Sequence, residues 1–433
     1  MQKYLKLGKR LFPICRSITG NGVRTTLKIL KEFIPKLKIY EVKSGTKVFD
    51  WEVPPEWNIK DAYVKDYNGN KIIDFQRNNL HLVSYSIPIN KQLTKKELFN
   101  HIHTHKIPNA IPYLTSYYKK YWGFCISKKQ KKIFDKKYKH NDLFEVKINS
   151  SLNKKGSLTY GELIIPGKSK QEILISTYIC HPSMANNELS GPLVSTALAR
   201  YFSSNKVHPK TLRFLFIPET IGAITYLNRN LNKLKKNVIA GYNLSCIGDE
   251  RQYSFIPTKY GNTLSDRAAI KAFKDLNLKF QTYSFLKRGS DERQFNSPGI
   301  NLPIASLMRT KYASYPEYHT SLDNFNVVTQ KGLKGGFNLT KKAIDILMKN
   351  FVPYNSVLCE PRISKRKLYE NLRARKRIEF NRNSYNFRMK YMNFLQYADG
   401  TNDLTNISNH IKLPFNETFK VFKVLRKKKL INI

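Results

Sequence analysis

Acidic side chains are scarce in this chain: 31 Asp and Glu stand against 76 Lys and Arg among 433 residues, which leaves a net charge of +45. The chain also lacks any run of about 18 apolar residues, so no membrane-spanning helix is expected. The segment MQKYLKLGKRLFPICRSITG has too short an apolar stretch, and no small-residue cleavage pattern, for a secretory signal. We therefore expect a cytoplasmic protein with no membrane partner.

Cysteine is equally sparse. The five cysteines are odd in number, lie far apart and never form a CxxC spacing, which argues against a disulfide framework or a thiolate zinc knot. Hydrophobic residues make up 41% of the chain and aromatic residues 12%, enough for a sizeable core. The basic excess is mostly lysine spread from end to end rather than one arginine-rich stripe. We interpret it as a bias of composition and not as a nucleic-acid footprint.

Three kinds of sequence pattern follow one another along the chain. Residues 17–36 open with turn residues and continue with apolar side chains at helical intervals, as in an amphipathic helix. Residues 43–126 contain short β-like runs separated by Pro, Asn and Gly, which predicts an inserted β-rich domain. Between residues 127 and 352 apolar strands alternate with amphipathic helices. Together with residues 1–42 this region predicts an α/β domain with a largely parallel sheet flanked by helices.

Residues 353–433 are predicted to form a linker and a winged helix-turn-helix, because three short helical patterns precede a terminal strand. One interpretation is DNA binding, with the basic residues of the last helix facing phosphates: Lys420, Lys423, Arg426 and Lys427. The other is an accessory module whose lysines are merely solvated. We prefer the second interpretation, because beyond Asn416 and Lys420 the recognition helix has few side chains suited to reading bases.

Candidate site residues follow successive predicted strands. The run ILISTYICH places His181 at a strand end, TLRFLFIPE places Glu219 at the next, and AGYNLSCIGD places Ser245 and Asp249 at a third. His319 lies far downstream in the loop YPEYHTSLDN. Open α/β sheets bind ligands at the carboxyl ends of their strands. Two histidines and a carboxylate meeting there have the chemistry of a zinc site with one open position.

These motifs resemble the zinc-dependent aminopeptidases and glutaminyl cyclases. More closely, the chain resembles a bacterial aminopeptidase-like family of unassigned activity, which has an inserted β domain and a C-terminal winged helix. The segments that carry the closer resemblance span nearly the whole chain: RSITGNGVRTTL, VFDWEVPPEWNI, IPYLTSYYKKYWGFC, TYICHPSMANNELSGP, IPETIGAITYL, GSDERQF and SLMRTKYASYPEYHTSLDN. The resemblance implies an aminopeptidase-like fold, a metal-dependent hydrolase activity and an association with polysaccharide biosynthesis.

Carried over position by position, the resemblance makes His181 and His319 metal ligands. Three expected carboxylates are replaced, namely the metal-bridging Asp by Asn187, one Glu of a Glu-Glu pair by Thr220, and a further Asp by Ser245, with Asp249 four residues on. An amide bridges two cations poorly, so we expect about one zinc per chain.

The role of the remaining carboxylates stays open. The resemblance makes Glu219 either the general base or a ligand. If Glu219 is a ligand, Glu188 or Asp291 is the candidate base. The cluster His101, His103 and His105 lacks a nearby carboxylate or thiol, so we do not expect a metal there. The aromatic stretch from Tyr113 to Trp122 is expected either to wall the substrate cleft or to pack between domains.

Two functions are consistent with these residues. The first is zinc-dependent hydrolysis of an amide bond in a small-molecule or peptide-like substrate, possible targets being a metabolite or amidosugar of polysaccharide biosynthesis. The second is a non-catalytic peptidase-like protein that binds or regulates, with the winged helix contacting DNA or a protein. Loss of three acidic positions favours the second, and retention of His181, Glu219 and His319 favours the first.

Overall fold

The computed structural model describes residues 1–204, 207–366, 368 and 382–433, so residues 369–381 of the expected linker lie outside the described part. Contacts between residues divide the chain into two units, residues 1–265 with 279–340 and residues 266–278 with 341–433. Within the described residues, no helix is both long enough and apolar enough to cross a bilayer.

The first unit is built on an eight-stranded sheet. Its strands in spatial order are β1 (Lys38–Lys43), β10 (Ser157–Ile165), β12 (Lys210–Ile217), β11 (Ser169–Tyr178), β13 (Val238–Leu244), β16 (Ile304–Met308), β14 (Ser254–Ile256) and β15 (Gln281–Thr282). The four central strands β12, β11, β13 and β16 run parallel, and β1, β10 and β14 join antiparallel. The predicted α/β fold with a largely parallel sheet is confirmed.

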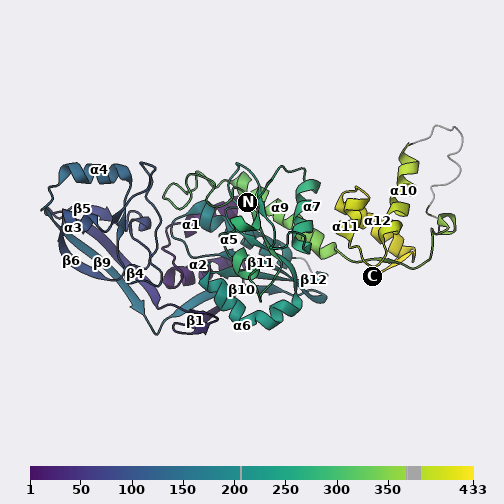
Figure 1. Ribbon diagram of the computed structural model, residues 1–433, viewed down its shortest axis with the longest axis horizontal. Coiled ribbons are helices and arrows are strands. Elements are labelled where there is room, and N and C mark those ends of the chain that lie inside the picture. The colour runs from purple at the N-terminus through teal and green to yellow at the C-terminus, as the bar shows by residue number, and fades with distance from the viewer. Residues whose placement is uncertain (205–206, 367, 369–381) are drawn as a thin grey trace. The chain divides into compact units, whose positions relative to one another are not determined.

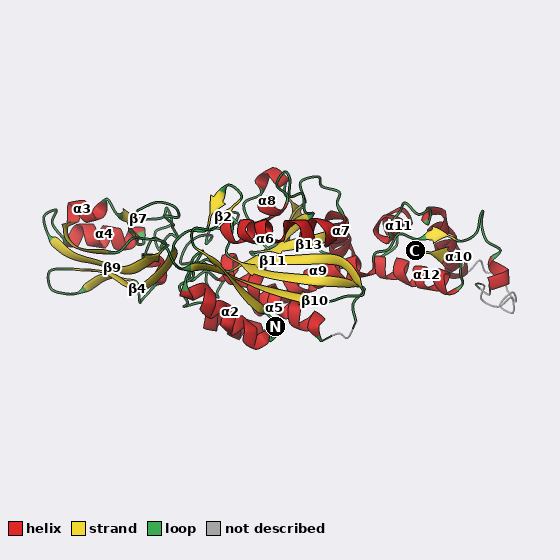
Figure 2. Ribbon diagram, turned by 90° about the horizontal axis from the view of Figure 1, so that it is seen from below, coloured by secondary structure: helices red, strands yellow, loops and turns green. Residues whose placement is uncertain are grey.

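Helices cover both faces of this sheet. Figure 2 shows α2 (Asn21–Phe33) and α5 (Ser190–Ser203) on one face of β10, β11 and β13, and α6 (Ile221–Asn237) and α8 (Glu292–Phe295) on the other. The unit also contains α1 (Gln2–Leu11), the π-helical turn η2 (Ala185–Leu189), the 3-10 turn η3 (Phe285–Lys287) and the first half of α9 (Gln330–Lys349). Central strands are buried on both faces, as the uninterrupted apolar runs of the sequence indicated.

The insertion is a four-stranded antiparallel sheet in the order β5 (Lys71–Asp74), β4 (Glu56–Lys65), β9 (Leu143–Asn153) and β6 (Ile89–Thr94). Figure 1 shows α3 (Lys95–Phe99) and α4 (Lys128–Lys137) beside it. Smaller elements complete it: β2 (Lys47–Val48), β3 (Trp51–Glu52), η1 (Asn79–His81), β7 (Ile102–His103) and β8 (Phe124–Cys125). The insertion thus runs to Asn153 and not to residue 126 as the sequence suggested, because β9 pairs with β4 and β6 through alternating buried side chains.

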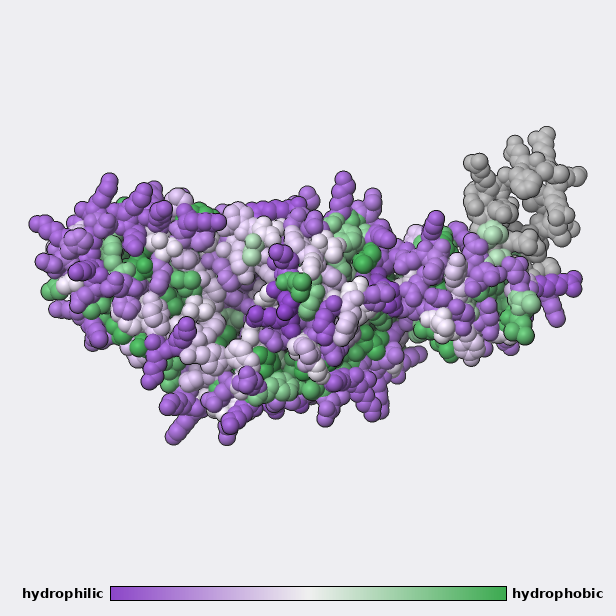
Figure 3. Space-filling model, in the orientation of Figure 1, coloured by the Kyte–Doolittle hydropathy of each residue, from purple (hydrophilic) through white to green (hydrophobic). Residues whose placement is uncertain are grey.

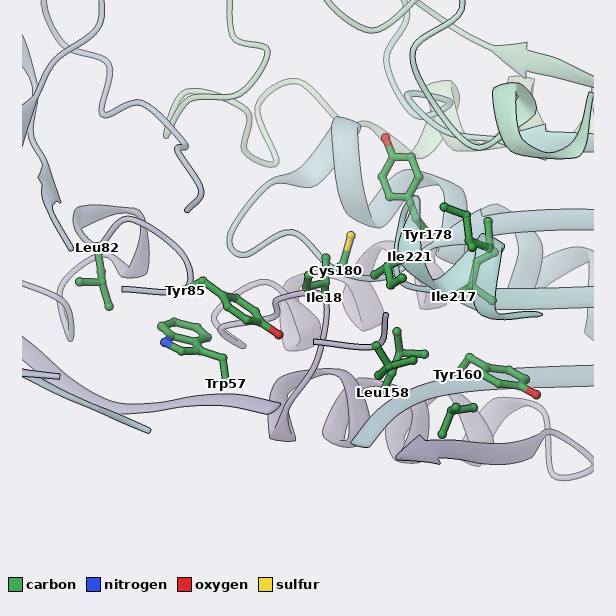
Figure 4. Close-up of a cluster of buried hydrophobic side chains, with 14 of the residues drawn as sticks. Ile18, Trp57, Leu82, Tyr85, Leu158, Tyr160, Tyr178, Cys180, Ile217 and Ile221 are labelled. Atoms are coloured by element: carbon green, nitrogen blue, oxygen red, sulfur yellow. The ribbon is translucent and has the colours of Figure 1, made fainter. Parts of the chain in front are cut away.

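One apolar core joins the insertion to the main sheet. Trp57 and Tyr85 of the insertion stack with ring centroids 5.7 Å apart. Their cluster continues through Ile18 to Cys180 and Ile217 at the ends of the central strands (Figure 4). The insertion is therefore packed as part of the first unit rather than tethered to it. In contrast, hydrophilic side chains dominate the face shown in Figure 3, as the high charge of the chain requires.

The Glu56 carboxylate is a polar anchor between the insertion and the sheet, and it predicts a pH dependence. Arg24 of α2 and the Ser157 N–H of β10 both donate to it, at 2.8 and 2.9 Å. Burial alone would raise the pKa of Glu56, but these donors outweigh burial and lower it to about 2. The folded-state pKa lies below that of the unfolded chain, so this stabilisation is complete above about pH 5 and lost as the pH falls toward 2.

We expect wild type to exceed Glu56→Gln in unfolding free energy by about 3 kcal/mol at pH 7, and the gap to shrink below pH 4. Urea unfolding followed by tryptophan fluorescence measures this, since Trp51, Trp57 and Trp122 all lie in the insertion. A gap that stayed constant from pH 7 to pH 3 would contradict the assignment.

The second unit is the winged helix-turn-helix together with the helical segments that pack on it. It contains α10 (Arg382–Tyr397), α11 (Leu404–His410), α12 (Phe415–Lys427), the short turn η4 (Ile363–Arg366) and the paired strands β17 (Tyr354–Asn355) and β18 (Ile431–Asn432). The end of α9 and most of α7 (Leu264–Asp275) belong to the same compact unit.

Helix α7 holds the helix-turn-helix at three points. Lys271 donates to the Leu413 carbonyl at 2.7 Å, within the turn between α11 and α12. The Phe415 N–H, in the first turn of α12, donates to the Asp275 carboxylate at 3.1 Å. In addition, Arg267 pairs with Asp403, the residue that caps α11.

Candidate active site

The site lies at the carboxyl ends of the central parallel strands. His181 follows β11, Glu219 follows β12, and His319 enters from the loop before α9. The His181 Nε2 atom is 3.6 Å from a Glu219 carboxylate oxygen, and the rings of His181 and His319 have centroids 5.6 Å apart. The structure therefore brings together the three residues on which the zinc hypothesis rests.

Glu188 orients His181, and Arg16 balances the charge of Glu188. Its carboxylate accepts a hydrogen bond from His181 Nδ1 at 2.8 Å, which leaves Nε2 directed at Glu219. Arg16 lies 3.3 Å from the other Glu188 oxygen and also donates to the carbonyls of His181 and Leu11. Arg16 and Glu188 are both fully buried. Burial alone would lower the pKa of His181, but Glu188 outweighs burial and raises it.

Sequence reasoning did not identify Arg16. Its only signal was its place in the segment RSITG, and nothing local indicates that a guanidinium from the first 20 residues reaches the end of β11. Glu188, expected as a possible base, lies behind His181 and is fully buried. Its hydrogen bond to Nδ1 thus holds the imidazole, and its other oxygen lies against Arg16.

Asn187 lies in the π-helical turn η2, next to Glu188. The turn is held open by Asp323, whose carboxylate accepts from the N–H groups of Asn186 and Asn187 at 2.6 and 2.8 Å. The Asn187 amide donates to the Tyr178 hydroxyl at 2.9 Å, while its carbonyl oxygen is buried without a partner. Such single-turn π-helices are frequent at functional sites.

Glu219 is presented by a strained turn. Thr220, the next residue, has φ +63°, a backbone conformation that side chains with a Cβ rarely adopt. Asp291 accepts from the Thr220 N–H at 2.7 Å, and Arg293 donates to the Thr220 hydroxyl at 2.6 Å. Asp291 and Arg293 therefore hold in place the turn that presents Glu219.

Two carboxyl groups here have raised pKa values. Burial raises the pKa of Glu219, although His181 opposes the effect. Burial, reinforced by Glu219, raises the pKa of Asp291 well above its usual range. One Asp291 oxygen is buried without a partner. Glu219 keeps 22% of its side chain exposed, whereas Asp291 is fully buried. Glu219 is thus the more accessible of the two carboxyl groups.

His319 is a neutral imidazole with a free buried nitrogen. Burial lowers its pKa to about 3, and its Nε2 atom has no partner. Its backbone has φ +55°, a further strained position, and its ring stacks on Tyr318 at 3.9 Å. A neutral histidine with an unpartnered nitrogen is ready to ligate a metal.

The insertion supplies one wall of the site. Tyr113 packs against the rings of both His181 and His319 at 5.2 Å, and its N–H donates to the His319 carbonyl at 2.8 Å. Pro112 and Thr320 form a β-bridge beside it. Tyr113 of the aromatic stretch therefore packs against both histidines of the site.

Other predicted residues have structural partners. Asp249 accepts from the Thr310 N–H and hydroxyl and from the Asn186 amide, so its oxygens are occupied. Ser245 is buried near the end of β13. His101 and His103 bond to the Trp122 carbonyl and the Tyr121 hydroxyl.

A metal fits better on the Nε2 side of His181 than on the Nδ1 side. In the described residues, Cys180, His181 and Glu188 form the tightest group of ligand atoms, all within 4.8 Å of one another. That group uses Nδ1, where the Arg16 guanidinium opposes a cation. On the other side, His181 Nε2 and Glu219 are 3.6 Å apart, close to the roughly 3.4 Å between two ligands that each lie about 2.1 Å from a tetrahedral zinc.

Comparison with known proteins agrees with the fold described above. Residues 5–350 match a Domain of unknown function (DUF4910), and residues 351–433 match a winged helix-turn-helix. A Clostridium acetobutylicum protein, provisionally named a polysaccharide biosynthesis protein with aminopeptidase-like domain, is 46% identical over 404 residues, which are 92% of this chain and 89% of that one.

Solved structures agree. A Clostridium acetobutylicum crystal structure, provisionally described as a peptidase, matches with TM-score 0.89 and 42% identity over 100% of this chain and 96% of that one. A zinc aminopeptidase from Bacillus subtilis matches with TM-score 0.58 over 79% of this chain and 93% of that one, and at 13% identity it shows the fold alone. The chain therefore belongs to the family of the Domain of unknown function (DUF4910), with an aminopeptidase-like fold and a C-terminal winged helix-turn-helix.

Proposed function

We propose that this protein is a zinc-dependent hydrolase of an amide bond in a small-molecule or peptide-like substrate. The observation that carries the proposal is the convergence of metal-type donors at one strand edge. His181 Nε2 faces Glu219 at 3.6 Å, and the buried His319 Nε2 and Asn187 Oδ1 atoms have no partner. A buried polar atom without a partner is costly, so these atoms suit a ligand.

In this proposal His181, His319 and Glu219 hold one zinc ion, with the Asn187 carbonyl oxygen as a further donor. Bound zinc would polarise the substrate carbonyl and lower the pKa of a bound water molecule. Glu188 fixes the tautomer and direction of His181 through the bond to Nδ1. Tyr113 shields the site from bulk water on one side.

Asp291 is the proposed proton acceptor. Glu188 is engaged by His181 and Arg16, and Glu219 is assigned to the metal, so Asp291 is left with an unpartnered oxygen. Its raised pKa suits a base that works near neutral pH. The polysaccharide biosynthesis name of the Clostridium acetobutylicum relative makes N-acylated amino sugars the first substrates to test.

The test combines metal analysis with hydrolysis. We expect purified, tag-free protein to hold about one zinc per chain and to hydrolyse some member of a panel of N-acetylated amino sugars and aminoacyl amides. His181→Ala and His319→Ala should lose the metal and the activity together. Neither zinc nor hydrolysis in the wild type would overturn the proposal and leave a non-catalytic binding protein as the better interpretation.

Asn187→Asp tests the identity of the metal-facing amide. A carboxylate adds the negative charge that holds a cation, so we expect tighter zinc binding by about 10-fold or more and partial loading of a second ion. Thr220 and Ser245 still lack carboxylates, so full double loading is not expected. Zinc titration by calorimetry measures both quantities. Unchanged affinity and stoichiometry would remove Asn187 from the site.

A further inference from the structure

A cavity lies beside the first two turns of α9, within the first unit. Its volume is about 370 Å³, and it is lined by Glu250, Tyr253, Arg309, Lys331, Lys334, Gly335 and Asn338. None of the proposed zinc ligands lines it. Its link to the amide site is indirect, because Asp249 and Thr310, which bond to each other, immediately adjoin Glu250 and Arg309 in the sequence.

Arg309 is a largely buried cation in the lining of this cavity. Its exposure is 7%, and its guanidinium packs 3.9 Å from the centre of the Tyr253 ring. Its Nε atom is buried with no hydrogen-bond partner. Among the described residues, no acidic side chain forms a salt bridge with it. Burying an unpaired charge is expensive, so an anion that enters the cavity would relieve that cost.

The helix is shaped to admit this guanidinium. A Cβ atom on Gly335 would lie 2.3 Å from Arg309 Nη1 and 2.6 Å from the Tyr253 hydroxyl, too close for either to keep its place. Glycine in the second turn of a helix costs stability relative to alanine. Its presence here allows the arginine to lie against α9 inside the cavity.

The rest of the cavity is also positive. Lys331 pairs with Glu250 at 3.0 Å, and Thr329 donates to the same carboxylate at 2.5 Å, so Glu250 is already engaged. Lys334 is exposed and forms no salt bridge with any described acidic residue. The amino-terminal end of a 20-residue helix adds partial positive charge. Arg309 and Lys334 thus leave about two positive charges uncompensated, which matches a phosphate dianion.

We propose that this cavity is a phosphate-binding site, in which Arg309 and Lys334 hold the oxygens of inorganic phosphate or of a phosphate monoester. Guanidinium groups pair well with phosphate because their donors match its oxygens. The site stands independently of the proposed zinc chemistry, since it shares no residue with it.

The experiment is calorimetric titration of the full-length protein at constant ionic strength. The probes are inorganic phosphate, glycerol 3-phosphate and acetate, and the variants are Arg309→Met, Lys334→Gln and Gly335→Ala. Lys129→Gln, an exposed lysine of α4, is the control with the same charge change as Lys334→Gln. We expect one saturable phosphate site, weakened about 10- to 100-fold by Arg309→Met and about 3-fold by Lys334→Gln.

The probes distinguish inorganic phosphate from a phosphate monoester as the ligand. Tighter binding of glycerol 3-phosphate than of inorganic phosphate indicates a monoester ligand, and the reverse order indicates the free ion. Acetate binding equal to phosphate would overturn the proposal, as would phosphate binding that every variant and Lys129→Gln lower equally. If Arg309→Met does not fold, the other two variants test the proposal. Gly335→Ala displaces the Arg309 guanidinium, and Lys334→Gln removes only an exposed charge, so both should weaken phosphate binding.

Discussion

Asp291→Asn is expected to lower amide hydrolysis by about 10²- to 10⁴-fold while the protein retains its zinc. This is the range that a positioned general base contributes. Asparagine keeps the size of the side chain and can still accept from the Thr220 N–H, so the turn that presents Glu219 should persist. The measurement is the steady-state rate of the zinc-loaded variant on whichever panel substrate the wild type hydrolyses.

Glu219→Gln separates the base from the ligand. If Glu219 binds zinc, this variant loses metal affinity by more than the about 10- to 100-fold that a supporting residue accounts for. Zinc retained together with lost activity would instead make Glu219 the base and contradict our assignment of Asp291. Glu317→Gln is the matched control, because Glu317 lies two residues before His319 but pairs with Arg251.

Arg16→Met is expected to lower the unfolding free energy by about 3–5 kcal/mol, the cost of leaving one partner of a buried ion pair uncompensated. The variant leaves the Glu188 carboxyl group fully buried, with His181 as its hydrogen-bond partner among the described residues. Urea unfolding followed by tryptophan fluorescence measures the loss, since Trp57 belongs to the apolar cluster that reaches Cys180.

The double variant Arg16→Met with Glu188→Gln provides the control. Removing both charges removes the uncompensated carboxylate, so the double variant should be more stable than Arg16→Met alone. If it is less stable than the single variant by the full cost of Glu188→Gln, the two side chains act independently. The orientation of His181 would then need another explanation.

The sequence was sufficient for residues whose role follows from strand order. His181 and Glu219 each follow a recognisable apolar run, and the carboxyl ends of parallel strands meet at one edge, so their approach was predictable. The strand β9 was misplaced because its run LFEVKIN is compatible with either sheet. Only its pairing with β4 and β6 decides which one it joins.

Contacts between residues far apart in the chain could not be predicted from the sequence. Arg16 meets Glu188 from 172 positions away, and Tyr113 meets His319 through a loop of the insertion. The two roles suggested for Asp249 and Glu188 also depended on side-chain direction. The η2 turn and the Thr310 contacts set that direction, and neither has a local pattern in the sequence.

The three contacts from α7 to the helix-turn-helix have a consequence for the reading of bases. A helix-turn-helix that enters the major groove presents the first turn of its second helix to base edges. In this chain that turn is occupied, because Asp275 accepts from the Phe415 N–H and Lys271 binds the Leu413 carbonyl just before it. A duplex docking in that manner would have to displace α7 from the turn before α12. Within the described residues, α7 thereby packs against the helix-turn-helix at the end of α12 from which such a helix would read bases.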